Sequence, residues 1–156
     1  MSSLKIVFTN CCSVMNKLNE LKTYLVNQKK KPDIIALCET WTNPSTADHE
    51  LELPGYTIKS RHDGSDTTDG RGRGLLIYAA QHLTVHEERP EIAINVNQCS
   101  CVHVTMKSRT LKLFTVYRSP NSEPENNEAV NTLIRKADRD AIFIGDYNYP
   151  TIDWEK

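Results

Sequence analysis

Short apolar runs alternate with polar segments along the chain, a pattern that predicts many β-strands and two helices. Runs typical of strands occupy residues 4–9, 33–38, 55–59, 75–78, 83–87, 99–106, 111–117 and 141–145. Residues 15–28 have helical spacing, because Leu18, Leu21 and Leu25 fall on one face. A second helix is predicted to start at Ser122-Glu123-Pro124-Glu125, which matches a capping box with proline in the first turn.

The first strand, helix and strand predict a right-handed crossover, in which residues 4–9 and 33–38 pair in parallel. Asn10 and Glu39 directly follow these two strands. Because the carboxyl ends of parallel strands meet at one edge of a sheet, we expect Asn10 and Glu39 at the same edge.

The last apolar run delivers Asp146 at its end and Asn148 two residues later, before Pro150 stops the strand. In an extended chain, Asp146 and Asn148 point to the same side, so a rigid strand would present an acid and an amide together. The alternative is an Asx turn, in which Asp146 only hydrogen-bonds its own backbone. This stretch alone leaves both interpretations open.

Composition narrows the class of protein. The 156 residues are 38% hydrophobic and 25% charged, which indicates one globular domain with a core. A net charge of −1 gives no overall field that attracts polyanions, so a nucleic-acid site would need a local basic patch. No run is long enough to span a membrane, and we expect no signal peptide, because the N-terminal apolar stretch is short and leads directly into a strand. Five cysteines without zinc-ligand spacing predict a reduced intracellular protein, nuclear or cytoplasmic, with free thiols.

The glycine- and arginine-rich segment at residues 70–74 resembles a phosphate cradle, but it enters a strand instead of a helix. We therefore favour a hairpin turn, with Arg71 and Arg73 as phosphate-backbone contacts. His86 and His103 are expected to pack or to face solvent, because their spacing matches no metal-ligand motif.

Polar groups follow four apolar strands, where loops begin. They are Asn10, Glu39, Tyr117 with Arg118, and Asp146 with Asn148. A carboxylate with nearby amide oxygens suits Mg²⁺ or Mn²⁺. An aspartate that accepts a proton from water, with an asparagine and a tyrosine that donate to phosphate oxygens, makes a phosphodiester-hydrolysis site.

These motifs resemble the endonuclease/exonuclease/phosphatase superfamily. The resemblance rests on Thr9-Asn10, Cys38-Glu39-Thr40-Trp41, Tyr117-Arg118-Ser119-Pro120-Asn121 and Gly145-Asp146-Tyr147-Asn148, in this order. Pro54-Gly55-Tyr56 and the tail through Asp153-Trp154 are more similar to the endonuclease domain of non-LTR retrotransposon polyproteins.

The resemblance implies an α+β fold, a two-sheet β-sandwich with flanking helices in a deoxyribonuclease-like four-layer arrangement. It implies that Glu39 holds Mg²⁺ or Mn²⁺ with Asn10 beside it, and that Asp146 positions or deprotonates the attacking water. Asn148 would hold the scissile phosphate or orient its neighbours, and Tyr117 would contact the phosphate. Arg118, Arg71 and Arg73 would bind the substrate. The implied function is nicking of DNA for retrotransposition, with a reverse transcriptase domain downstream.

The sequence departs from the family pattern in one respect. The family ends in a Ser-Asp-His motif, and no histidine follows His103 here. We therefore expect residues 1–156 to be the N-terminal two-thirds of one domain, incomplete at the C-terminus and inactive alone. The rival interpretations are a phosphoinositide or sphingolipid phosphodiesterase of the same fold, and a non-catalytic remnant that binds nucleic acid or protein.

Overall fold

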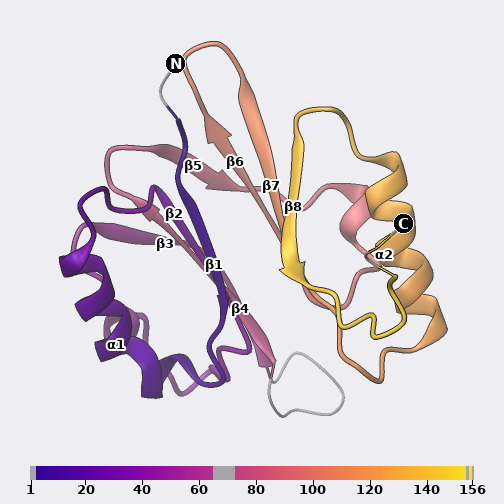
Figure 1. Ribbon diagram of the computed structural model, residues 1–156, viewed down its shortest axis with the longest axis horizontal. Helices are drawn as coiled ribbons and strands as arrows, with labels where there is room; N and C mark the ends of the chain where they lie inside the picture. Colours follow the sequence, from indigo (N-terminus) through magenta and orange to yellow (C-terminus); the bar gives the residue numbers. More distant parts are fainter. Residues whose placement is uncertain (1–2, 65–72, 154, 156) are drawn as a thin grey trace.

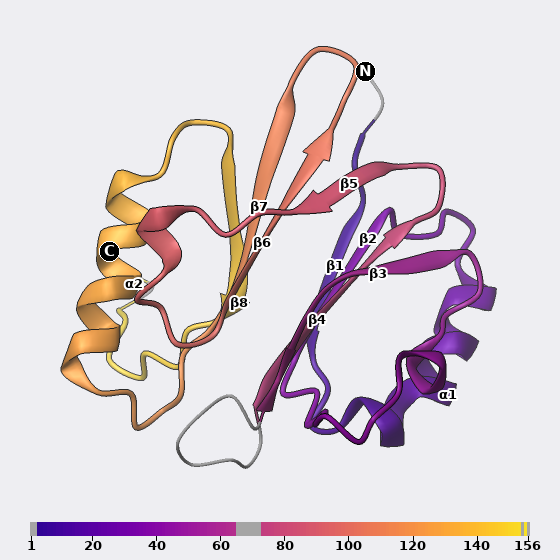
Figure 2. The same cartoon turned by 180° about the vertical axis from the view of Figure 1, so that it is seen from behind.

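Two four-stranded sheets lie face to face between two helices in the computed structural model (Figures 1 and 2), which describes residues 3–64, 73–153 and 155. The first sheet has the order β1 (Ile6–Asn10), β2 (Ile34–Cys38), β4 (Gly74–Ala80), β3 (Tyr56–Asp63). The second has the order β5 (Thr84–Glu87), β6 (Cys99–Thr105), β7 (Thr110–Tyr117), β8 (Ala141–Asp146). The helices are α1 (Val14–Asn27) and α2 (Pro124–Lys136), with short 3₁₀ turns η1 (Asp48–Leu51) and η3 (Glu91–Ala93).

Each sheet contains one parallel pair, and both pairs end at the same side of the molecule. β1 pairs in parallel with β2, as the crossover pattern predicts, and β7 pairs in parallel with β8. The other pairings are antiparallel. In Figure 1 the carboxyl ends of β1 and β8 both lie toward the lower centre, where the two sheets meet. The α+β fold with two sheets and flanking helices is therefore confirmed.

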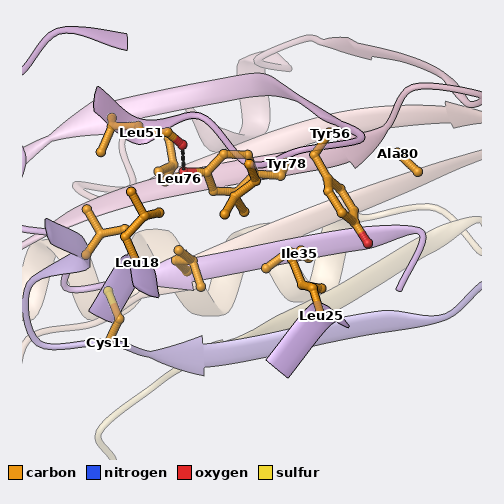
Figure 3. Close-up of a cluster of buried hydrophobic side chains, with 12 residues drawn as sticks. Cys11, Leu18, Leu25, Ile35, Leu51, Tyr56, Leu76, Tyr78 and Ala80 are labelled. Carbon is orange, nitrogen blue, oxygen red and sulfur yellow. Dashed lines mark hydrogen bonds between the residues drawn. The ribbon is translucent and has the colours of Figure 1, made fainter. Parts of the chain in front are cut away.

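Three apolar layers hold this arrangement together. Between the sheets, Ile34 and Ile77 of the first sheet pack against Val102 and Leu113 of the second. The outer face of the first sheet packs against α1 and η1, with Leu18, Leu51 and Tyr78 among the buried side chains (Figure 3). The outer face of the second sheet is covered by α2 and η3, where Val130 and Leu133 are fully buried. Burial of these side chains supplies the main driving force for folding.

β3 is longer than its apolar pattern predicts. Residues 60–63 continue the strand after a bulge between Ile58 and Ser60. Ser60 is buried between the sheets, where its Oγ donates to Glu87 Oε1 at 2.6 Å and lies 2.6 Å from Ser100 Oγ. Because these partners come from the other sheet, a polar residue could fill an inward position that the pattern assigned to a loop.

The capping box predicted at Ser122 is wrong. α2 begins at Pro124 after Glu123, and no side chain caps its first turn. Ser122 Oγ instead accepts a hydrogen bond from Asn126 Nδ2 at 2.7 Å. Pro124 at the first helical position supplies the turn geometry, because its fixed φ suits a helix start.

All five cysteines are free thiols, and four of them are buried, including Cys99 and Cys101 beneath α2.

Within the described ranges, no helix has both the length and the apolar character needed to cross a membrane. β3 and β4 pair antiparallel up to Asp63 and Gly74. The turn predicted between them, with Arg71, lies outside the described residues.

Candidate functional site

Four strand ends converge into one polar corner, which we call the carboxylate corner: Asn10, Glu39, Tyr117 and Asp146. Asn10 Nδ2 donates to Glu39 Oε1 at 2.8 Å and to Asp146 Oδ2 at 3.2 Å. One amide nitrogen therefore joins a carboxylate from the first sheet to a carboxylate from the second. Tyr117 completes the corner from β7, where its interaction with Glu39 contributes to the raised pKa of its hydroxyl.

The backbone fixes Asp146 beside Tyr117. These two residues are register partners in the β7–β8 pair, and Arg118 N donates to Asp146 O at 2.8 Å. Gly145, one residue earlier, lies so close to β7 that an added Cβ would be 1.9 Å from Val116 O. Only glycine permits this approach, so the glycine before Asp146 is a requirement of strand packing.

Glu39 occupies a tight turn at the end of β2, with φ of +52°. Ser13 N donates to Glu39 O at 2.9 Å, which ties the turn to the start of α1. On the other side, an added Cβ at Gly74 would lie 2.3 Å from Thr40 Oγ1. The neighbouring segments therefore enclose the Glu39 backbone closely, and Asn10 Nδ2 donates to its carboxylate at 2.8 Å.

Tyr117 is buried beneath the corner, against Cys38 and Leu75. Burial raises the pKa of its hydroxyl, and the hydrogen bond to Glu39 raises it further. The group stays protonated at physiological pH because ionisation would place a second negative charge beside Glu39. Tyr117 is therefore a permanent hydrogen-bond donor at this corner.

Asn148 is not presented beside Asp146 as an extended chain would predict. Its φ is +46°, so the backbone turns after β8. Its side-chain Nδ2 donates to Arg118 O at 2.7 Å, and its backbone N–H donates to Asp146 Oδ1 at 3.3 Å. Asp146 thus forms the Asx turn, and its carboxylate also accepts from Asn10, whereas the Asn148 amide is held by Arg118 O and is not presented beside it.

Arg118 is engaged by the protein itself. Its side chain is buried, with the residue 7% exposed. The guanidinium donates to Asn127 Oδ1 at 2.7 Å and Asn148 O at 2.7 Å, and it lies 4.1 Å from the centre of the Tyr149 ring. This arginine joins the loop after β8 to α2, and its role as a substrate contact stays a prediction. Arg73 lies next to the corner, where its backbone oxygen accepts from Trp41 N at 2.9 Å.

Sequence reasoning missed two residues near Glu39. Cys12 is exposed, with its Sγ 3.2 Å from Asn10 Oδ1 and 3.5 Å from Glu39 Oε2. Trp41 is 48% exposed two residues after Glu39, with φ of +56°. The sequence pointed to Trp41 only as part of the Cys38-Glu39-Thr40-Trp41 motif. The signal that could have found it is an aromatic residue close to a carboxylate.

The donor set of the corner fits a hard divalent cation. Oxygens of Glu39 and Asp146 both lie within hydrogen-bond distance of the same Asn10 nitrogen. Asn10 Oδ1, which accepts from Cys12 N at 3.3 Å, could supply a further oxygen if the amide turned over. Mg²⁺ binds proteins through one or two carboxylates of this kind. Glu39 and Asn10 are therefore the residues that could hold such an ion.

His86 faces solvent and His103 is mostly buried, as expected, but the two histidines also lie in a group that their sequence spacing does not show. Ligand atoms of His86, Glu88 and His103 all lie within 4.8 Å of one another. Sequence spacing could not reveal this group, because His86 and His103 lie on different strands and are joined by antiparallel pairing. The cluster is separate from the carboxylate corner.

Comparisons with known proteins agree with this geometry. A model of the Endonuclease/Exonuclease/phosphatase family matches residues 10–156. A search of curated proteins found no match. The endonuclease domain of TRAS1, a telomere-specific non-LTR retrotransposon, is 18% identical with a TM-score of 0.64, over 96% of this chain and 61% of that chain.

Two further solved structures share the fold. The 3′-5′ exonuclease NExo from Neisseria meningitidis is 19% identical with a TM-score of 0.64, over 93% of this chain and 58% of that one. The AP endonuclease LMAP from Leishmania major is 16% identical with a TM-score of 0.66, over 92% and 54%. The chain thus spans less than two thirds of the length of each of these proteins.

Proposed function

Because the chain belongs to the endonuclease/exonuclease/phosphatase family, we propose that its carboxylate corner takes part in the metal-dependent hydrolysis of DNA phosphodiesters. The observation that carries this proposal is the Asn10 amide, which joins Glu39 and Asp146 across the two sheets. Such a pair of carboxylates, with a buried phenol beneath it, suits phosphoryl chemistry better than simple binding.

In this proposal each residue acts on a stated group. Glu39 and Asn10 hold Mg²⁺ or Mn²⁺, which when bound neutralises charge on the phosphate oxygens. Asp146 accepts a proton from the attacking water at a carboxylate oxygen. Tyr117 turns its single hydroxyl proton from Glu39 to a non-bridging phosphate oxygen. Asn148 supports this set indirectly, because its backbone N–H orients Asp146.

DNA is the proposed substrate, and retrotransposition is the proposed context. The resemblance to the TRAS1 domain and to the DNA-processing enzymes NExo and LMAP supports this choice. A reverse transcriptase downstream in the same polyprotein would follow from it. The matched structures are longer than this chain. We therefore propose that full activity also needs the part of the family domain that those structures contain and that does not align with this chain.

A plasmid-nicking assay with Mg²⁺ and with Mn²⁺ tests the proposal. It compares residues 1–156 with an extended protein that carries the remaining length of the family domain. Glu39→Gln should lower nicking by the extended protein by roughly 10²-fold or more, since a metal ligand is lost. Glu20→Gln, on the exposed face of α1, is the matched control and should leave nicking unchanged.

Metal binding is measured separately on residues 1–156, by Mn²⁺ titration followed through water proton relaxation. Glu39→Gln should weaken Mn²⁺ binding about 10-fold or more, within the range for loss of a charged ligand. If Glu39→Gln left both nicking and Mn²⁺ affinity unchanged, the assignment of the corner would be wrong. Equal nicking by both protein lengths would show that residues 1–156 are sufficient.

A further inference from the structure

His86, Glu88 and His103 form a second group of metal-ligating side chains, which we call the distal histidine cluster. His86 and His103 are direct cross-strand partners on β5 and β6. Their rings meet edge to face, with centroids 5.1 Å apart. Glu88 Oε2 lies 3.2 Å from His103 Nδ1 and 3.9 Å from His86 Nε2. Two imidazoles and one carboxylate therefore face a common point.

The strands present these groups on one face. Glu88 N donates to Cys101 O at 3.0 Å, so the β5–β6 ladder continues past the end of β5. Residues two apart in a strand point the same way, which puts Glu88 beside His86. His103 lies on the same face as Cys101, which packs under α2. The cluster is therefore on the outer face of the second sheet, beyond the apolar layer.

The lysine next to the cluster is paired with a carboxylate, so its charge does little to repel a cation. Lys112 of β7 is the register partner of His103 and lies on the same face. Its ammonium is bound by Asp138 Oδ2 at 2.5 Å, so its positive charge is neutralised locally. The Glu88 side chain is 57% exposed and His86 58%, while His103 is 12% exposed. Small rotations of two exposed side chains around a fixed His103 can close the site.

This cluster cannot share an ion with the carboxylate corner. Along the strands, His103 is level with Lys112, and Lys112 is level with Ala141 at the start of β8. Asp146 lies at the other end of β8, five residues on. At 3.3 Å per residue this separation is roughly 16 Å. β5 also lies at the opposite edge of the sheet from β8 (Figure 2).

We propose that the distal histidine cluster binds a borderline divalent cation of the Zn²⁺ class. Two imidazole nitrogens and a carboxylate form a set that zinc accepts, leaving a fourth position for water. Imidazole does not suit Mg²⁺, so the two sites select different metals. The ion would cross-link β5, a four-residue strand at the sheet edge, to β6. It would therefore hold in place the edge strand of the second sheet.

The test is calorimetric titration of ZnCl₂ into metal-free residues 1–156, with excess MgCl₂ present. We expect an ion bound by the wild type, with affinity reduced at least 10-fold in His86→Ala and in His103→Ala. His86 is exposed, so His86→Ala should fold normally. The matched control is His82→Ala, because His82 is also exposed and faces a single carboxylate, Asp33, at 3.5 Å. His82→Ala should bind zinc as the wild type does.

Two further measurements separate this site from the carboxylate corner. Cobalt(II) bound to the cluster should give visible bands without thiolate charge transfer, whereas an ion at Cys12 would show that transfer. Glu39→Gln should leave zinc affinity unchanged. Zinc should also slow amide exchange in β5 of the wild type but not of His86→Ala. Absence of zinc binding, or equal binding by wild type, His86→Ala and His103→Ala, would overturn the proposal.

Discussion

Asn10 Nδ2 lies 3.2 Å from Asp146 Oδ2, although the two residues are 136 positions apart in the sequence. The contact crosses from the first sheet to the second, and the same nitrogen also donates to Glu39. A neutral amide thus holds two carboxylates close together. Fixed groups of this kind reduce the reorganisation that catalysis would need.

Replacing the Asn10 amide by a carboxylate tests whether this amide keeps Glu39 and Asp146 together. Asn10→Asp puts a third carboxylate beside Glu39 and Asp146, and the repulsion should lower stability by roughly 1–2 kcal/mol without divalent ions. Saturating Mn²⁺ should remove most of this loss, because a more acidic site binds the cation more tightly. Thermal melts with and without Mn²⁺ measure it. Asn19→Asp, exposed on α1, is the control, and a Mn²⁺-independent loss at Asn10 would contradict the prediction.

The Tyr117 hydroxyl should contribute to rate more than to stability. Tyr117→Phe should reduce nicking by the extended protein by about 10²-fold, the cost of losing one donor to a developing oxyanion. Because burial raises the Tyr117 pKa, its loss should not move the pH–rate profile near neutrality. Tyr56→Phe is the control: its hydroxyl donates to Pro32 O at the other end of the sheet, so stability should fall and rate should not. Equal rates for Tyr117→Phe and wild type would refute the role.

Arg118 should behave as a structural residue. Arg118→Lys removes the planar fork that reaches Asn127 and the carbonyl oxygens after β8, at a cost of about 2–3 kcal/mol in urea unfolding. The salt dependence of DNA binding should stay the same, since no phosphate contact is lost. Arg109→Lys, on the exposed β6–β7 hairpin, should affect neither quantity. A shallower salt slope with unchanged stability would restore Arg118 as a DNA contact.

Alkaline pH should destabilise the protein through its buried thiols. Burial raises the pKa of Cys99 and of Cys101 to about 12. Above the ordinary thiol pKa of about 8.5, the unfolded chain releases protons that the native state keeps, so stability is full below that pH and falls as pH rises. Each buried thiol should cost about 1.4 kcal/mol per pH unit.

Urea unfolding under reducing conditions near pH 7.5 and pH 9.5 measures this loss. Cys99→Ala should lose less stability between the two pH values than the wild type does, because one titrating thiol is gone. The comparison is between slopes, so any cavity created by the substitution cancels. Identical slopes would mean that Cys99 does not contribute.

The sequence by itself determined the strands and the polar residues that end them. Asn10, Glu39 and Asp146 follow apolar runs whose period leaves little choice of structure, and parallel pairing then brings strand ends to one edge. The fold class followed from the family resemblance that these residues carry. Local chemistry was sufficient here because side-chain period and strand direction are properties of short segments.

Tertiary structure decided what each polar side chain contacts. Arg118 follows its strand as Glu39 does, yet it is buried because Asn127 and the backbone after β8 surround it. The spacing of His86 and His103 in the sequence matches no metal-ligand motif, and only the β5–β6 register makes them neighbours. Ser60 is inward because Glu87 satisfies it from the other sheet. The partners of a side chain come from distant segments, so no local pattern encodes them.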